Sequence, residues 1–176
     1  MNSQVKDKNK FHIHTLGCKV NQYESQAMRE LLIRAGFEES DGREAADVYI
    51  VNTCTVTGEA DRESRNIMGR FHRANPDARI VVTGCMVEND PYGFSSIPGI
   101  SAVLKNSEKS RIARVLEGSG GRGHGDYPAE MSVSGFKGHS RAYVKIQDGG
   151  ENRCSYCKVP LVRGRLKSKP IKDILS

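Results

Sequence analysis

Apolar residues recur along the first two thirds of the chain in two alternating patterns, one typical of strands and the other of helices. Short β-branched runs predict strands over residues 11–16, 48–51, 79–83 and 102–104. Helical spacing predicts helices over residues 21–35 and 59–74, and a third that carries Ile112, Val115 and Leu116. Because this alternation is typical of parallel βαβ units with right-handed crossovers, we predict an α/β fold: a flavodoxin-like parallel sheet with helices on both faces.

The first helix has a specific start signal. Asn21 fits the N-cap position, and Glu24, three residues later, completes a capping box. Ala27 and Met28 then continue the apolar stripe, and Gly36 is well placed to end the helix. We therefore expect Asn21 and Glu24 to satisfy backbone N–H groups at the start of the helix.

Composition divides the 176 residues into four parts. Residues 1–10 are polar and are expected to be disordered, and residues 11–118 are expected to form the α/β domain. Residues 119–138 are rich in glycine and predict a flexible linker. Residues 139–176 open with a predicted strand over 142–146, which leads into a loop, and too few residues follow to build a second core.

Charge and hydropathy narrow the class of protein. Residues 119–176 hold 11 Lys and Arg against 5 Asp and Glu, so they carry the whole net charge of +6. A local basic block favours an anionic partner such as RNA, although a solvated basic face would have the same composition. No apolar run approaches the ~20 residues of a membrane span, and the first residues lack the apolar core of a secretory signal. We expect a cytoplasmic protein with no membrane contact.

Three of the five cysteines occupy one topological position. Cys18, Cys54 and Cys85 each follow a predicted strand. Because the carboxyl ends of parallel strands share one edge, about 4.8 Å apart from strand to strand, we expect the three thiols to converge there. Cytosolic thiols stay reduced, and clustered thiolates suit zinc or an iron–sulfur cluster. Three unrelated, inert small side chains are the alternative.

Cys154 and Cys157 form a CysxxCys pair in the later loop. On spacing alone this pair is half of a zinc knuckle, a redox pair or part of an iron–sulfur site. The basic run after it, Arg163, Arg165, Lys167 and Lys169, is expected to contact phosphates or to form a solvated face.

Several segments resemble the radical S-adenosylmethionine methylthiotransferases. Residues 15–24, 51–57 and 82–85 are similar to the amino-terminal domain of that family, and residues 147–165 are similar to the start of its radical domain. The resemblance therefore covers residues 11–118 and 139–176. The wording from Gly17 to Glu24 resembles the branch that modifies threonylcarbamoyladenosine beside the tRNA anticodon.

This resemblance implies two 4Fe–4S clusters. Cys18, Cys54 and Cys85 would hold the first, whose open iron carries the sulfur to be inserted. A CysxxxCysxxCys loop would hold the second, which binds and cleaves S-adenosylmethionine. Here only Cys154 and Cys157 of that loop are present, because Gly150 stands where the third ligand should be. The implied partner is the anticodon stem-loop of a tRNA.

The chain differs from the family pattern at Gly150 and in the short length of its radical domain, and these differences decide which function we expect. We predict a tRNA methylthiotransferase present as a fragment or degraded copy, which binds the first cluster but is inactive alone because its βα-barrel radical domain is incomplete. A non-catalytic α/β module that binds iron–sulfur or zinc is the main alternative. The ribosomal-protein methylthiotransferase branch is a second, and a flavodoxin-like domain with inert cysteines is a third.

Overall fold

The computed structural model describes residues 10–42, 45–55, 57–94, 96–118, 131–136, 143–152 and 154–175. Its main feature is a parallel five-stranded sheet in the order β2-β1-β3-β4-β5. The strands are β1 (Lys10–Thr15), β2 (Glu38–Glu39), β3 (Val48–Thr53), β4 (Arg79–Gly84) and β5 (Ile100–Leu104). This is the flavodoxin-like strand order, so the predicted fold class is confirmed.

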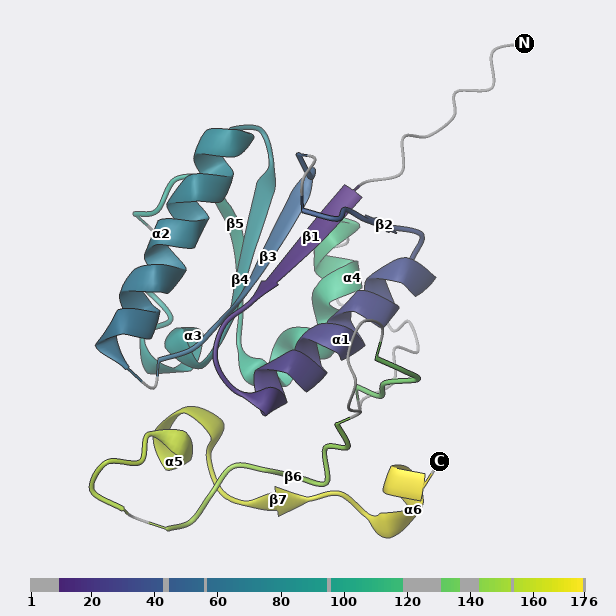
Figure 1. Cartoon of the computed structure of the whole chain (residues 1–176), viewed down its shortest axis with the longest axis vertical. Coiled ribbons are helices and arrows are strands. Elements are labelled where there is room, and N and C mark those ends of the chain that lie inside the picture. The colour runs from purple at the N-terminus through teal and green to yellow at the C-terminus, as the bar shows by residue number, and fades with distance from the viewer. Residues whose placement is uncertain are drawn as a thin grey trace.

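Helices cover both faces of the sheet. They are α1 (Lys19–Arg34), α2 (Gly58–Ala74), α3 (Cys85–Asn89), the 3₁₀ helix η1 (Asn106–Arg111) and α4 (Ile112–Leu116). Figure 1 shows α2 on one face and α1 and α4 on the other. Residues 10–118, called here the sheet region, thus form the three layers that the alternation predicts.

Each face has its own apolar core. On one side Met68 and Phe71 of α2 pack against the sheet, and the Phe71 ring stacks on Tyr49 of β3 at 4.2 Å between centroids. On the other side Met28 of α1 and Ile112 of α4 cover the opposite face of the strands. Burying each such side chain contributes about 1.5–3 kcal/mol, so the sheet region is held mainly by its own interior.

The capping prediction for the first helix was wrong. Helix α1 begins at Lys19 with Cys18 as its N-cap, and no side-chain hydrogen bond caps it. Asn21 lies inside the helix, fully buried, and its amide donates to the backbone oxygens of Leu16 and Thr53. Tertiary contacts therefore take the side chain that the local pattern assigned to a cap.

Residues 131–136 belong to the predicted linker, and they pack along α1. The Ser134 N–H donates to the Glu30 carboxylate at 3.0 Å, and the Gln26 amide donates to the Gly135 carbonyl at 2.6 Å. The remainder of the linker prediction, over 119–130 and 137–138, lies outside the described residues, as does the predicted disorder of residues 1–9. Lys10 is already part of β1.

Residues 143–175, called here the second segment, form no layer of their own. They contain β6 (Gln147–Asp148), α5 (Val159–Arg163), β7 (Lys167–Ser168) and α6 (Ile171–Leu175), and β6 pairs antiparallel with β7. Figure 1 shows the segment lying across the edge at which the parallel strands end. No helix in the described part of the chain has both the length and the apolarity to cross a membrane.

The strand predicted over residues 142–146 was wrong for the part that the structure describes. Residues 143–146 pair with no strand, and ladder pairing begins only at Gln147, opposite Ser168. The alternation of apolar and polar residues there has a different cause, because Lys145 turns toward Glu24 of α1 while Val144 and Ile146 stay exposed.

Candidate metal centre

The three cysteines singled out in the sequence lie at the ends of neighbouring strands. Cys18 follows β1, Cys54 follows β3 and Cys85 follows β4, and these three strands are adjacent in the sheet. The register aligns Thr15 with Asn52 and Asn52 with Thr83, so each cysteine comes two or three residues after an aligned position. The topology on which the metal prediction rests is therefore present.

Glycines make the close approach of these strand ends possible. A Cβ on Gly17, whose φ is +89°, would lie 2.7 Å from the Cys54 sulfur. A Cβ on Gly84, whose φ is +104°, would lie 2.3 Å from the Thr53 carbonyl oxygen. Two of the three cysteines thus follow a glycine because any side chain there would push the strand ends apart.

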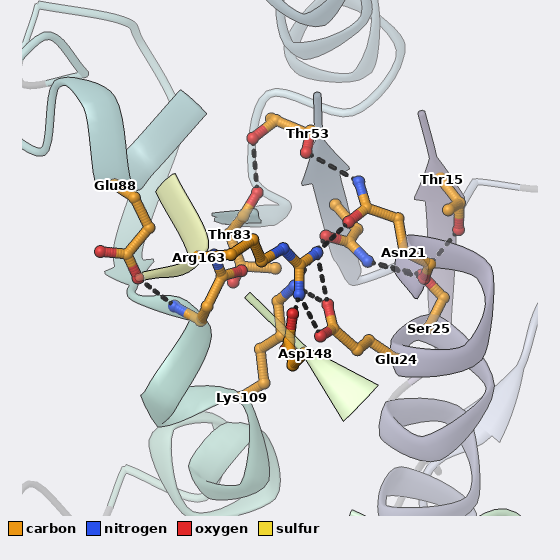
Figure 2. Close-up of polar contacts among 12 residues, drawn as sticks. Thr15, Asn21, Glu24, Ser25, Thr53, Thr83, Glu88, Lys109, Asp148 and Arg163 are labelled. Carbon is orange, nitrogen blue, oxygen red and sulfur yellow. Dashed lines mark hydrogen bonds and ion pairs between the residues drawn. The ribbon is translucent and has the colours of Figure 1, made fainter. Parts of the chain in front are cut away.

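Buried polar side chains fix the same strand ends. Asn52 donates from its amide to the Asn21 carbonyl and the Ser25 hydroxyl, both at 3.0 Å. Thr53 donates from its hydroxyl to the Thr83 carbonyl at 2.7 Å, and Figure 2 shows these contacts linking α1, β3 and β4. Because a buried polar group without a partner costs free energy, this network stabilises the observed arrangement of the edge.

The thiols differ in environment. Cys54 and Cys85 are buried, whereas Cys18 is exposed at the N-cap of α1. Burial raises the pKa of Cys85 despite the opposing charges of Arg163 and Lys109, and Cys54 is near enough to raise it further. Among the residues that the structure describes, no three His, Cys, Asp or Glu side chains are already grouped as a metal ion requires. Ligation by all three cysteines therefore stays a prediction.

The surroundings of the cysteines nevertheless fit a thiolate-bound group. Thiolates are soft ligands suited to iron–sulfur clusters or zinc. The hydroxyls of Thr55, after Cys54, and Thr83, before Cys85, are buried without a hydrogen-bond partner among the described residues. Unpaired donors in residues so close to the cysteines along the chain are expected where a bound group would accept from them.

A buried carboxylate lies beside this edge, and the sequence reading missed its role. Glu24 of α1 is 2% exposed, and Lys109 of η1, itself 0% exposed, lies 2.5 Å from it. Burial alone would raise the pKa of Glu24, but Lys109, Arg163 and Lys145 together lower it to about 2. Glu24 is therefore ionised and shared by three cations.

Burial in this cluster disfavours the charged form of Lys109. Burial lowers its pKa, and the favourable field of Glu24 only partly compensates. The ammonium also donates to the Asn52 side-chain oxygen at 3.0 Å, which ties it to the end of β3. Three cations lower the pKa of Glu24 because they stabilise its carboxylate. Burial lowers the pKa of Lys109, whose ammonium faces one carboxylate.

Two of the three cations come from the second segment. Arg163 of α5 contacts Glu24 and Asp148, and Lys145 contacts the same two carboxylates at 2.8 and 2.6 Å. We call Glu24, Lys109, Lys145, Asp148 and Arg163 the ion-pair cluster. Arg163 was expected to face phosphates or solvent, but its side chain is 5% exposed and pairs within the protein.

The second cysteine pair lies in an open loop next to the first group. Cys154 is exposed and Cys157 is half-buried, and the Cys157 N–H donates to the Cys154 carbonyl at 3.0 Å to close a turn. Lys158 donates to the Thr55 carbonyl at 2.8 Å, so the residue after Cys157 contacts the residue after Cys54. The two cysteine groups therefore lie at the same edge of the sheet, where β3 ends.

Gly150, where the resemblance calls for a cysteine, has room for a side chain. A Cβ there would meet only the Val159 side chain, at an ordinary contact distance of 3.5 Å. Gly149, by contrast, has a φ of +76°, and a Cβ there would lie 2.2 Å from the Arg165 carbonyl oxygen. The absence of a third thiol is therefore not imposed by crowding or by the backbone.

Comparison with known proteins agrees with this geometry. A family profile described as "Uncharacterized protein family UPF0004" matches residues 10–104, which hold β1 to β5 and all three cysteines of the first group. The matched range is just over half of the chain, so the chain belongs to that class of α/β domain.

Curated relatives extend the match to almost the whole chain. The threonylcarbamoyladenosine tRNA methylthiotransferase MtaB of Chlamydia pneumoniae is 41% identical over 170 residues, covering 96% of this chain and 39% of the relative. MtaB of Bacillus subtilis is 36% identical over 172 residues, covering 92% and 38%. The ribosomal protein uS12 methylthiotransferase RimO of Chlamydia felis is 31% identical over 183 residues, covering 98% and 39%.

These matches identify the family. The chain belongs to the methylthiotransferase family, on its MtaB branch, as the resemblance of the Gly17 to Glu24 segment predicted. The chain spans about two fifths of the length of the curated relatives it matches.

Proposed function

We propose that this chain is the amino-terminal part of a cytoplasmic tRNA methylthiotransferase acting on threonylcarbamoyladenosine in an anticodon stem-loop. Residues 11–118 would be its α/β domain, 119–138 its linker and 139–176 the start of its βα-barrel radical domain. The observation that carries the proposal is the position of three cysteines at the ends of three adjacent parallel strands. The names of the MtaB relatives supply the reaction and the substrate.

Within this function, we propose that Cys18, Cys54 and Cys85 hold a 4Fe–4S cluster. Three thiolates would leave one iron without a protein ligand, and the bound cluster would supply the sulfur atom to be inserted. Gly17 and Gly84 let the strand ends approach closely, which supports the proposal of shared ligation. The hydroxyls of Thr55 and Thr83 would donate to sulfur, which satisfies two otherwise unpaired buried groups.

For the second cysteine group we propose the opposite outcome. Cys154 and Cys157 provide two thiolates on an exposed loop, and Gly150 provides none. Two thiolates alone bind weakly to a cluster that normally has more protein ligands. This chain by itself is therefore proposed to bind the first cluster, to lack a stable second cluster, and to leave S-adenosylmethionine intact.

Iron and sulfide analysis of the chain, reconstituted without oxygen, tests the assignment. We expect about four irons per chain with matching sulfide. Replacing Cys18, Cys54 and Cys85 together by Ala should abolish both, whereas Cys154→Ala with Cys157→Ala should leave them unchanged. About one zinc without sulfide would indicate a zinc module instead. Equal iron in the triple variant would reject the proposed site.

Gly150→Cys provides a gain-of-function test of the second group. Because the added side chain fits, the variant should bind roughly twice the iron of the unchanged chain. Gly149→Cys is the matched control, since its backbone conformation and the Arg165 carbonyl exclude a side chain. An unchanged iron content in Gly150→Cys would contradict the assignment of position 150 as the missing ligand.

A further inference from the structure

Arg163 lies where the second segment meets the sheet region. Its guanidinium donates to the Glu24 carboxylate, to the Asn21 side-chain oxygen at 2.5 Å and to Asp148 at 3.3 Å. Figure 2 shows it between α1 and the end of α5, with these partners on several sides. Its helix, α5, also packs against α3, the helix that begins at Cys85.

The helix that carries this guanidinium lies next to the first cysteine group, because α5 packs against α3, whose first residue is Cys85. The charges of Arg163 and Lys109 oppose the rise in the pKa of the Cys85 thiol that burial causes. Within the ion-pair cluster three cations face two carboxylates, which leaves one positive charge without a carboxylate partner. An anionic group bound at Cys85 would complete the balance.

We propose that Arg163 is a positioning residue that couples the two segments: from α5, which packs against the helix that begins at Cys85, it places a positive charge near this cysteine, so the reduction potential of a cluster there depends on docking of the second segment. This inference rests on the proposed function, because it assumes that Cys85 is a cluster ligand. Hydrogen bonds to cluster sulfurs and nearby charge are established determinants of cluster potential.

The geometry of the contacts requires arginine. One planar fork contacts the Glu24 carboxylate, the Asn21 amide oxygen and the Asp148 carboxylate at once. A lysine would keep the charge but has a single nitrogen, so it would lose part of this set. Replacement by glutamine removes the charge and leaves Glu24 with two cations instead of three.

The experiment compares four forms of the full chain: unchanged, Arg163→Gln, Arg163→Lys and, as a matched control, Arg165→Gln. Arg165 is exposed and lies two residues away in the same segment. Two quantities are measured: the midpoint potential of the reconstituted cluster by redox titration, and hydrogen exchange of α5 in the cluster-free protein.

We expect Arg163→Gln to shift the potential to a more negative value and to speed exchange in α5 about tenfold. Arg163→Lys should fall between it and the unchanged chain, and Arg165→Gln should match the unchanged chain. Failure of the unchanged chain to bind iron would overturn the proposed function together with this inference. Normal iron with equal potentials in all four forms would overturn this inference alone. If Arg163→Gln does not fold, a potential in Arg163→Lys equal to that of the unchanged chain overturns it.

Discussion

In the sheet region large apolar side chains fill both faces of the sheet, whereas in the second segment most of them face solvent. Met28 and Met68 are fully buried in the two cores, while Leu161, Ile171 and Leu175 are 75–80% exposed. Among the described residues of the second segment, Val162 is the buried apolar side chain. The segment is instead connected to the sheet region by Lys145, Lys158 and Arg163.

This difference shows that the two parts respond to different perturbations. Truncating a side chain in an apolar core lowers the free energy of unfolding, because it leaves a cavity. A segment held by ion pairs loses stability when one of the charged partners is removed. Glu24 belongs to both systems, because it lies on a core helix and accepts from both segments. Some variants should therefore destabilise one region alone, and others should destabilise both regions together.

The largest effect is expected from Glu24→Gln, which should destabilise both regions together. It leaves Lys109 buried without a carboxylate, and both cations of the second segment keep only Asp148 of their two carboxylate partners. We expect a loss of about 3–5 kcal/mol in the free energy of unfolding, measured by urea denaturation at neutral pH. The control is Glu38→Gln, at an exposed position in β2. A loss no larger than that of the control would contradict the assigned role of Glu24.

Truncating one apolar side chain in each region should sharpen the comparison. Met68→Ala opens a cavity in a core where the side chain is 0% exposed, so we expect a loss of about 2–5 kcal/mol. Ile171→Ala removes a side chain that is 75% exposed, and its effect should stay within about 0.5 kcal/mol. Urea denaturation checks both. A loss of more than about 1 kcal/mol for Ile171→Ala would show that the second segment has an apolar core of its own.

Acid should weaken the ion-pair cluster in a defined pH range. The pKa of Glu24 falls from 4.5 to about 2 on folding, so its ionised form stabilises the protein above the unfolded pKa. This contribution, about 3 kcal/mol, is lost as the pH falls from about 4.5 toward about 2. Unfolding measured across that range should show the difference between the unchanged chain and Glu24→Gln shrinking as the pH falls. A constant difference would mean that Glu24 is not the titrating group.

The sequence predicts the sheet well because its main strands are buried β-branched runs, and the metal prediction followed from their shared edge. It does not predict β2, since Glu38 and Glu39 are two exposed charged residues with no apolar pattern. It also misses the ion-pair cluster, because Glu24 pairs with residues 85, 121 and 139 positions away.

A signal for the cluster was nevertheless present. Glu24 precedes Ala27, Met28 and Leu31 by three, four and seven residues, so it shares the apolar face of α1. Lys109 stands in the same relation to Ile112, Ala113 and Leu116. Two opposite charges, each at the start of an apolar stripe, indicate a buried pair, whereas the capping-box reading considered only the local chain.

The smallest expected effect tests whether the second segment opens separately from the sheet region. Lys158→Met keeps the aliphatic stem but removes the hydrogen bond from Lys158 to the Thr55 carbonyl. A hydrogen bond of this kind contributes about 0.5–1.5 kcal/mol, so exchange in α5 should quicken between about twofold and about tenfold. Exchange in β3 and β4 should not change, and Lys172→Met, at an exposed position in α6, serves as the control. Equal acceleration in β3 and α5 would mean that both regions open as one cooperative unit, which would remove the physical basis for treating them as separately stabilised.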